Sequence, residues 1–94
     1  MRDRLSLDEY MILHYIYKRT LNGVSEFTQP NIIADKFEIK RNKVYLILDK
    51  LNKLGYIERI QKIRRESGGY YTLWSCTTEG ALLISRTQHL IVEV

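Results

Sequence analysis

Gly55 marks the point where the hydrophobic period of this chain changes, and that change restricts the possible folds more than any other feature. Upstream of it, apolar residues recur at the spacing of one helix face, at Val44, Ile47, Leu48, Leu51 and Leu54. Downstream, residues 56–63 and 70–77 alternate as β-strands do, around a polar turn with two glycines, and the alternation places Trp74 in the core. The sequence therefore predicts a half-buried helix that leads directly into a β-hairpin.

Capping residues divide the rest of the chain into three further helices. Ser6 and Glu9 form a capping box, in which each side chain accepts a hydrogen bond from the backbone N–H of the other residue. Pro30 suits the first turn of a helix, where its missing N–H costs nothing. The expected elements, in order, are a helix over 7–21, an extended piece over 24–27, a helix over 30–37 capped by Thr28 or Gln29, the helix that ends at Leu54, the hairpin, and a helix over 78–91 capped by Thr77 or Thr78.

The composition is that of a small globular chain without a catalytic or metal-binding motif. Its 94 residues are 45% hydrophobic, enough for one modest core. The apolar run over 10–17 is too short to span a membrane, and the N-terminus lacks a signal-peptide core, so we expect a cytoplasmic location. Cys76 is the one cysteine, and His14 and His89 have no partners at metal-ligand spacing. We expect no enzyme activity, no metal, no cofactor and no membrane association, and we infer no small-molecule ligand.

Basic residues are concentrated in the middle of the chain. The net charge is +4, yet residues 36–66 alone hold ten basic and four acidic side chains, whereas the remainder holds five basic and seven acidic ones. A segregated basic region is typical of proteins that bind polyanions. A solvated, lysine-rich surface would give the same count.

The stretch from Thr28 to Arg59 resembles the winged helix-turn-helix core of MarR-type and related small archaeal regulators. The matching positions are Ala34, Ile39, Val44, Leu51 and the run Leu54-Gly55-Tyr56-Ile57. The segment Cys76-Thr-Thr-Glu-Gly80 is similar to the Leu-Thr-Glu-x-Gly segment that follows the wing in that family. Leu46 departs from the pattern, because such recognition helices often carry arginine there. The resemblance covers roughly residues 7–86.

This resemblance implies an α+β fold in one domain over 1–94, a winged helix-turn-helix with a three-helix core, a two-stranded wing and a C-terminal helix, that binds double-stranded DNA. The helix-turn-helix would span 28–54 and the wing 56–77. In such a fold the N-terminal turns of the second helix of the pair enter the major groove. The predicted recognition residues are Lys40, Arg41, Asn42, Lys43, Tyr45 and Leu46. The predicted wing contacts are Lys62, Arg64, Arg65 and Ser67, and the predicted backbone contacts are Thr28, Gln29, Asn31 and Lys50.

The cations at the start of the third helix support this interpretation. Lys40, Arg41 and Lys43 oppose the helix dipole there, at a typical cost of about 0.3–1 kcal/mol each, and no Ser, Thr or Asp stands at position 40. Local stability does not favour this arrangement, whereas a phosphate backbone does. The alternative is an exposed turn that tolerates the small cost.

Two apolar elements predict a homodimer through the first and C-terminal helices. Residues 10–21 are apolar around most of a helix, and residues 82–84 and 90–92 add apolar surface at the other end. The last helix could instead fold back over its own domain. The function expected is that of a sequence-specific transcriptional regulator that represses by occupancy. The alternatives are a nonspecific architectural DNA-binding protein and a module for protein or RNA contact.

Overall fold

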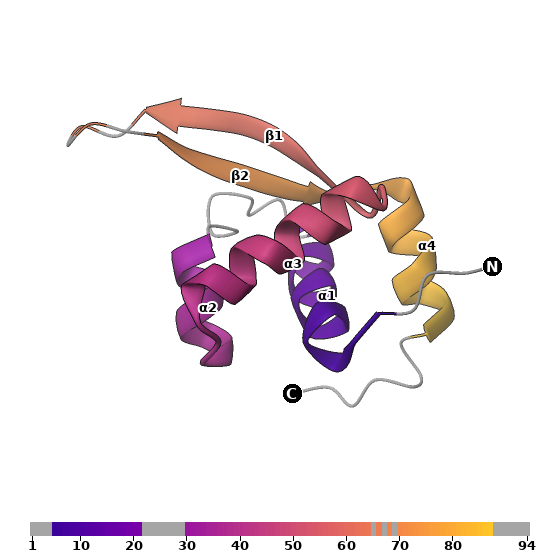
Figure 1. Cartoon of the computed structure of the whole chain (residues 1–94). Helices are drawn as coiled ribbons and strands as arrows, with labels where there is room; N and C mark the ends of the chain where they lie inside the picture. The colour runs from indigo at the N-terminus through magenta and orange to yellow at the C-terminus, as the bar shows by residue number, and fades with distance from the viewer. Residues whose placement is uncertain (1–4, 22–29, 65, 67, 69, 88–94) are drawn as a thin grey trace.

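The computed structural model describes residues 5–21, 30–64, 66, 68 and 70–87 of the chain, and these residues form four helices and a two-stranded antiparallel sheet (Figure 1). The elements are α1 (Leu7–Leu21), α2 (Pro30–Phe37), α3 (Arg41–Lys53), β1 (Ile57–Arg64), β2 (Tyr70–Cys76) and α4 (Thr78–Thr87). Their order and type confirm the α+β prediction. The expected extended piece over 24–27 and the end of the last helix over 88–91 lie outside the described residues.

Helix α1 begins at the predicted capping box and forms the centre of the core. The Ser6 N–H donates to Glu9 Oε1 at 2.8 Å, and the Glu9 N–H donates to Ser6 Oγ at 3.2 Å. The helix packs against β2, α4 and α3, which explains why it is apolar on more than one face. Its fully buried residues are Ile12, Leu13 and Ile16. The apolar circumference of α1 therefore has an explanation within its own chain, apart from a partner subunit.

Helices α2 and α3 form the helix-turn-helix, and both end in the same way. At the end of α3, Gly55 has a φ of +85° and the Tyr56 N–H donates to the Leu51 carbonyl at 2.9 Å. At the end of α2, Glu38 has a φ of +53° and the Ile39 N–H donates to the Ala34 carbonyl at 3.1 Å. Each is the six-residue closure of a Schellman motif, which needs a left-handed residue at its C′ position. The predicted core face of α3 is confirmed, since Val44, Ile47, Leu48 and Leu51 are buried.

The hairpin is irregular at one point on β1. Arg59 faces Trp74 and Gln61 faces Leu73 in the strand register, so Ile60 is an extra residue in a β-bulge. Trp74 is buried, as the alternation predicts, and the Arg59 guanidinium lies 5.7 Å from its ring centroid. The bulge turns the side chain of Ile60 outward, where half of it is exposed.

Helix α4 starts on a polar junction with the turn that joins α3 to β1. Thr77 Oγ1 accepts from the Gly80 N–H at 3.1 Å and donates to the Gly55 carbonyl at 2.6 Å, and this confirms Thr77 as the cap. The helix then folds back on α1 and buries Ile84, which is the alternative that the sequence left open for it. In the described part of the chain, no helix has the length and apolar character needed to cross a membrane.

Candidate nucleic-acid interface

The first turn of α3 is exposed, basic and uncapped. Lys40 is the N-cap residue, and within the described residues its side chain makes no capping hydrogen bond. The Lys40 carbonyl accepts from the N–H groups of Lys43 and Val44, at 3.0 and 3.1 Å, as helix geometry requires. Arg41 and Asn42 follow, and their side chains are exposed as well. Lys40 and Arg41, together with Lys43, thus place three cations with exposed side chains at the positive end of the helix dipole.

The middle of the outward face of α3 is apolar. Leu46 is 70% exposed and Tyr45 53% exposed, on the side opposite the buried core residues. Farther along, Lys53 Nζ lies 3.0 Å from Asp49 Oδ2, in an exposed ion pair between residues one helical turn apart. The surface that α3 presents therefore changes from cationic to apolar to ion-paired along its length.

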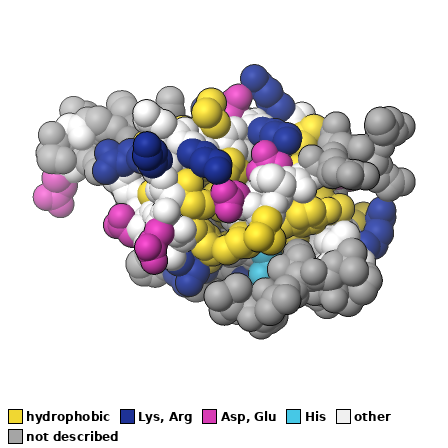
Figure 2. Space-filling view, turned by 60° about the horizontal axis from the view of Figure 1, so that its bottom comes forward, with side chains coloured by type: hydrophobic (Ala, Val, Ile, Leu, Met, Phe, Trp, Pro, Cys, Tyr) yellow, Lys and Arg dark blue, Asp and Glu magenta, His cyan; other side chains and the backbone are white. Residues whose placement is uncertain are grey.

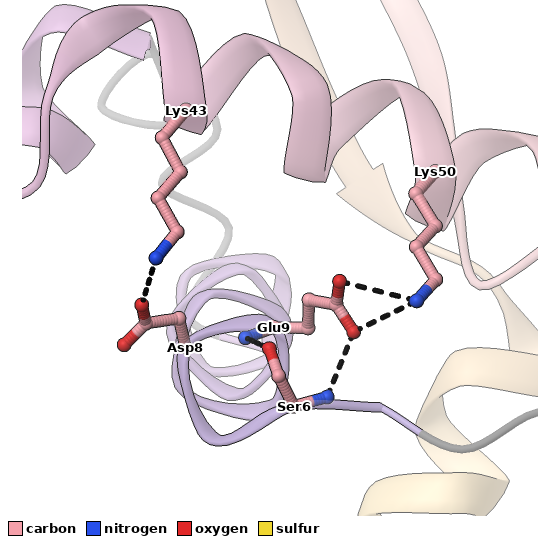
Figure 3. Close-up of polar contacts among 5 residues, drawn as sticks. All are labelled: Ser6, Asp8, Glu9, Lys43 and Lys50. Carbon is pink, nitrogen blue, oxygen red and sulfur yellow. Dashed lines mark hydrogen bonds and ion pairs between the residues drawn. The ribbon is translucent and has the colours of Figure 1, made fainter.

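Two of the predicted DNA-contact lysines are paired with the first turn of α1 (Figure 3). Lys43 Nζ lies 2.9 Å from Asp8 Oδ2, and Lys50 Nζ lies 3.1 Å from both carboxylate oxygens of Glu9. Partial burial alone would raise the pKa of Glu9. The hydrogen bond from the Ser6 backbone and the pairing with Lys50 outweigh it, so the pKa of Glu9 lies below its usual value.

Sequence reasoning did not find these acidic partners. Asp8 is 35 residues from Lys43, and Glu9 is 41 residues from Lys50. Local spacing carries no signal for a contact between helices so far apart.

Two of the four predicted wing residues, Lys62 and Arg64, are described in their backbone only. Lys62 faces Thr72 and Arg64 faces Tyr70 in the strand register, while Arg65 and Ser67 lie outside the described residues. In Figure 1 the C-terminal end of β1, the N-terminal end of β2 and the N-terminal end of α3 all lie toward the left, away from α4. The two strands therefore extend toward the end of the molecule where α3 begins.

Of the residues near α2 that are predicted to contact the DNA backbone, the structure describes only one. Thr28 and Gln29 lie outside the described residues. Asn31 lies in the first turn of α2 and is half-buried, with a buried Oδ1 that has no hydrogen-bond partner within the described residues. An amide held there could donate to a phosphate only through its nitrogen.

Cys76 lies at the base of the hairpin, away from this surface. Its Sγ donates to the Thr77 carbonyl at 3.5 Å, and burial raises the pKa of the thiol to about 11. The thiol is therefore protonated at neutral pH, as expected for a structural cysteine.

An antiparallel hairpin that follows a helix-turn-helix, with a helix on each side in the sequence, defines a winged-helix protein. Solved structures share this fold. FabT of Streptococcus pneumoniae in complex with DNA is 21% identical, with a TM-score of 0.70 over 92% of this chain and 54% of that chain. The S. aureus MepR–DNA complex is 19% identical, with a TM-score of 0.70 over 92% of this chain and 57% of that one. ZitR of Lactococcus lactis, a zinc-responsive MarR family member, is 19% identical, with a TM-score of 0.67 over 96% of this chain and 63% of that chain.

The likeness confirms the predicted winged-helix fold. No protein-family model matches the sequence, and no curated protein matches it either. The chain spans a little more than half the length of the FabT and MepR chains.

Proposed function

We propose that this chain is a DNA-binding domain that inserts α3 into the major groove of double-stranded DNA and lays its wing on the minor groove or the adjacent backbone. The observation that carries the proposal is the exposed, uncapped and basic first turn of α3. Two of the solved structures that share its fold are DNA complexes. We infer no catalysis.

The recognition residues in this proposal have exposed side chains in the first two turns of α3 or directly before it. Arg41 would pair with guanine and Asn42 with adenine, each worth about 1–3 kcal/mol of discrimination. The remaining recognition residues are Lys40, Lys43, Tyr45 and Leu46. The wing would supply Lys62, Arg64, Arg65 and Ser67, and Thr28, Gln29, Asn31 and Lys50 would contact phosphates. With such contacts, the chain would act as a sequence-specific transcriptional regulator that represses by occupying its operator.

Selection of bound fragments from a random duplex library, followed by a salt titration, tests the proposal. We expect a consensus sequence, together with an affinity that falls as salt rises. Arg41→Ala and Asn42→Ala should relax the preference at single base positions. Lys62→Ala should weaken binding to matched and random duplexes alike.

Three outcomes would point elsewhere. A steep salt dependence without a consensus would indicate an architectural DNA-binding protein. Equal losses on matched and random duplexes in all three variants would count against direct readout. No binding to duplex at low salt would exclude the proposal and favour a module that contacts protein or RNA.

We also propose that the domain acts as a homodimer. Leu7 and Leu21, at the two ends of α1, are 68% and 67% exposed, and Leu82 of α4 is 47% exposed. Figure 2 shows a band of hydrophobic side chains that crosses one face of the molecule below a group of charged residues. Such a band favours a partner subunit on this face.

A further inference from the structure

The two ion pairs between α1 and α3 differ in how firmly they are held (Figure 3). The Glu9 carboxylate receives Lys50 on both oxygens, receives the Ser6 N–H at 2.8 Å, and has a side chain only 14% exposed. The Asp8 carboxylate contacts Lys43 through one oxygen, and the two side chains are 36% and 58% exposed. Glu9 is therefore part of the packing between the helices, whereas the Asp8–Lys43 pair is open to exchange.

Lys43 also occupies a particular place on α3. It follows Arg41 and Asn42 in the basic first turn, which the proposed function puts against DNA. A lysine ammonium is a compact charge on a flexible stem with three donors, so it can turn from one oxygen ligand to another. A DNA phosphate that approaches this turn meets a lysine that already has a carboxylate ligand.

We propose that Asp8 and a DNA phosphate compete for the ammonium group of Lys43. Asp8 is then an intramolecular counter-ion that lowers the affinity of the domain for duplex of any sequence. The inference rests on the proposed function, because it requires α3 to meet DNA. It means that the first turn of α1 helps to set the affinity for DNA without having to touch a base.

The size of the effect follows from the exposure of the pair. Exposed ion pairs of this kind change equilibria by about 1.4- to 5-fold. We expect Asp8→Asn to tighten binding to a random-sequence 30-base-pair duplex by about two- to fivefold, as measured by fluorescence anisotropy at constant salt. Lys43→Gln should weaken binding and reduce the slope of log K against log salt by about 0.9, because one phosphate contact is lost.

The decisive measurement is Asp8→Asn in the Lys43→Gln background. If the two groups compete as proposed, Asp8→Asn has no effect on affinity once Lys43 is gone. Glu79→Gln is the matched control, because Glu79 is an exposed acid in the first turn of α4 and its removal changes the net charge equally. We expect Glu79→Gln to leave affinity unchanged. Circular dichroism melts establish that each variant is folded at the assay temperature.

Three results would overturn the inference. An equal gain from Asp8→Asn with and without Lys43 would mean that Asp8 repels phosphates directly. Weaker binding by Asp8→Asn would mean that Asp8 positions Lys43 for the phosphate. An equally large gain in affinity from Glu79→Gln would mean that the effect comes from net charge alone. If the unmodified chain binds no duplex, the proposed function fails and the inference falls with it, and that result is distinct from the other three.

Discussion

Glu38 has the left-handed backbone that Gly55 has at the end of α3, although only glycine adopts it without steric cost. We expect Glu38→Gly and Glu38→Asn to raise the free energy of unfolding by up to about 1 kcal/mol, because the β-carbon strain is removed or better tolerated. Glu38→Ala is the control, since it removes the same carboxylate and keeps the β-carbon. In urea unfolding, the Glu38→Asn and Glu38→Gly variants should have a higher free energy of unfolding than the unmodified chain and the Glu38→Ala variant. A gain for Ala equal to that for Gly would assign the effect to charge.

Gly80 is required for a different reason, the closeness of α4 to the turn after α3. A β-carbon at position 80 would collide with the carbonyl oxygen of Tyr56 and lie 2.8 Å from Cys76 Sγ. We expect Gly80→Ala to lower the free energy of unfolding by about 1–3 kcal/mol, the usual range for overpacking. Adding Cys76→Ala should not restore stability, because the backbone collision remains. Ser85→Ala, on the exposed side of α4, should change little.

At the scale of elements, the sequence predicts what local signals encode. The capping box at Ser6 and Glu9, Pro30 and Gly55 each determine a helix end through chemistry within a few residues, and those ends agree with the structure. The extra residue at Ile60 had no such signal, because a bulge depends on how two strands pair. The exposed, basic first turn of α3 was likewise predicted from local signals. Its ion pairs with α1 were not, because they depend on how the helices pack.

The contact between α1 and α3 should make stability depend on pH. The pKa of Glu9 lies below its unfolded value of 4.5, so the stabilisation is fully present above pH 4.5 and is lost as the pH falls through the folded pKa. Glu9→Gln keeps a capping-box acceptor but loses the charge that Lys50 faces. We expect it to cost about 0.5–1 kcal/mol at pH 7 and less below pH 4, as measured by urea unfolding. A deficit that is the same at both pH values would contradict a charge effect.

The outward face of α3 should make the domain sensitive to thymine methyl groups. Leu46 is apolar and highly exposed where it would meet base edges, and burial of one methyl is worth about 0.8 kcal/mol. A random duplex library made with dUTP in place of dTTP lacks that methyl. We expect it to bind about three- to fourfold more weakly per contacted methyl, and we expect Leu46→Ala to remove the difference. Leu82→Ala, on α4, is the control and should retain it. Equal affinity for both libraries in the unmodified chain would exclude this contact.

At the scale of the molecule, we expect the apolar residues that stay exposed after folding to form the contact between subunits. Helix α4 covers α1 with Ile84 but leaves Leu82 exposed, and Leu7 and Leu21 add exposed surface at the ends of α1. The side chains that we propose to read bases lie on a different helix, α3. A two-fold dimer through α1 and α4 would therefore leave both recognition helices free to contact DNA, about 34 Å apart along the duplex.

A dimer of this geometry should be detectable in solution and should also select a DNA site with two half-sites. We expect sedimentation equilibrium to show a dimer that Leu82→Glu converts to a monomer, because a charge buried in an apolar contact is costly. Ile60→Glu, on the exposed bulge of the hairpin, should leave the dimer intact. Selection with the unmodified chain should then recover two inverted half-sites with centres about 10 base pairs apart, whereas the Leu82→Glu variant should select one half-site with lower affinity. A single half-site from a chain that sediments as a dimer would mean that its subunits associate through another surface, because the arrangement proposed here presents both recognition helices to one face of the duplex.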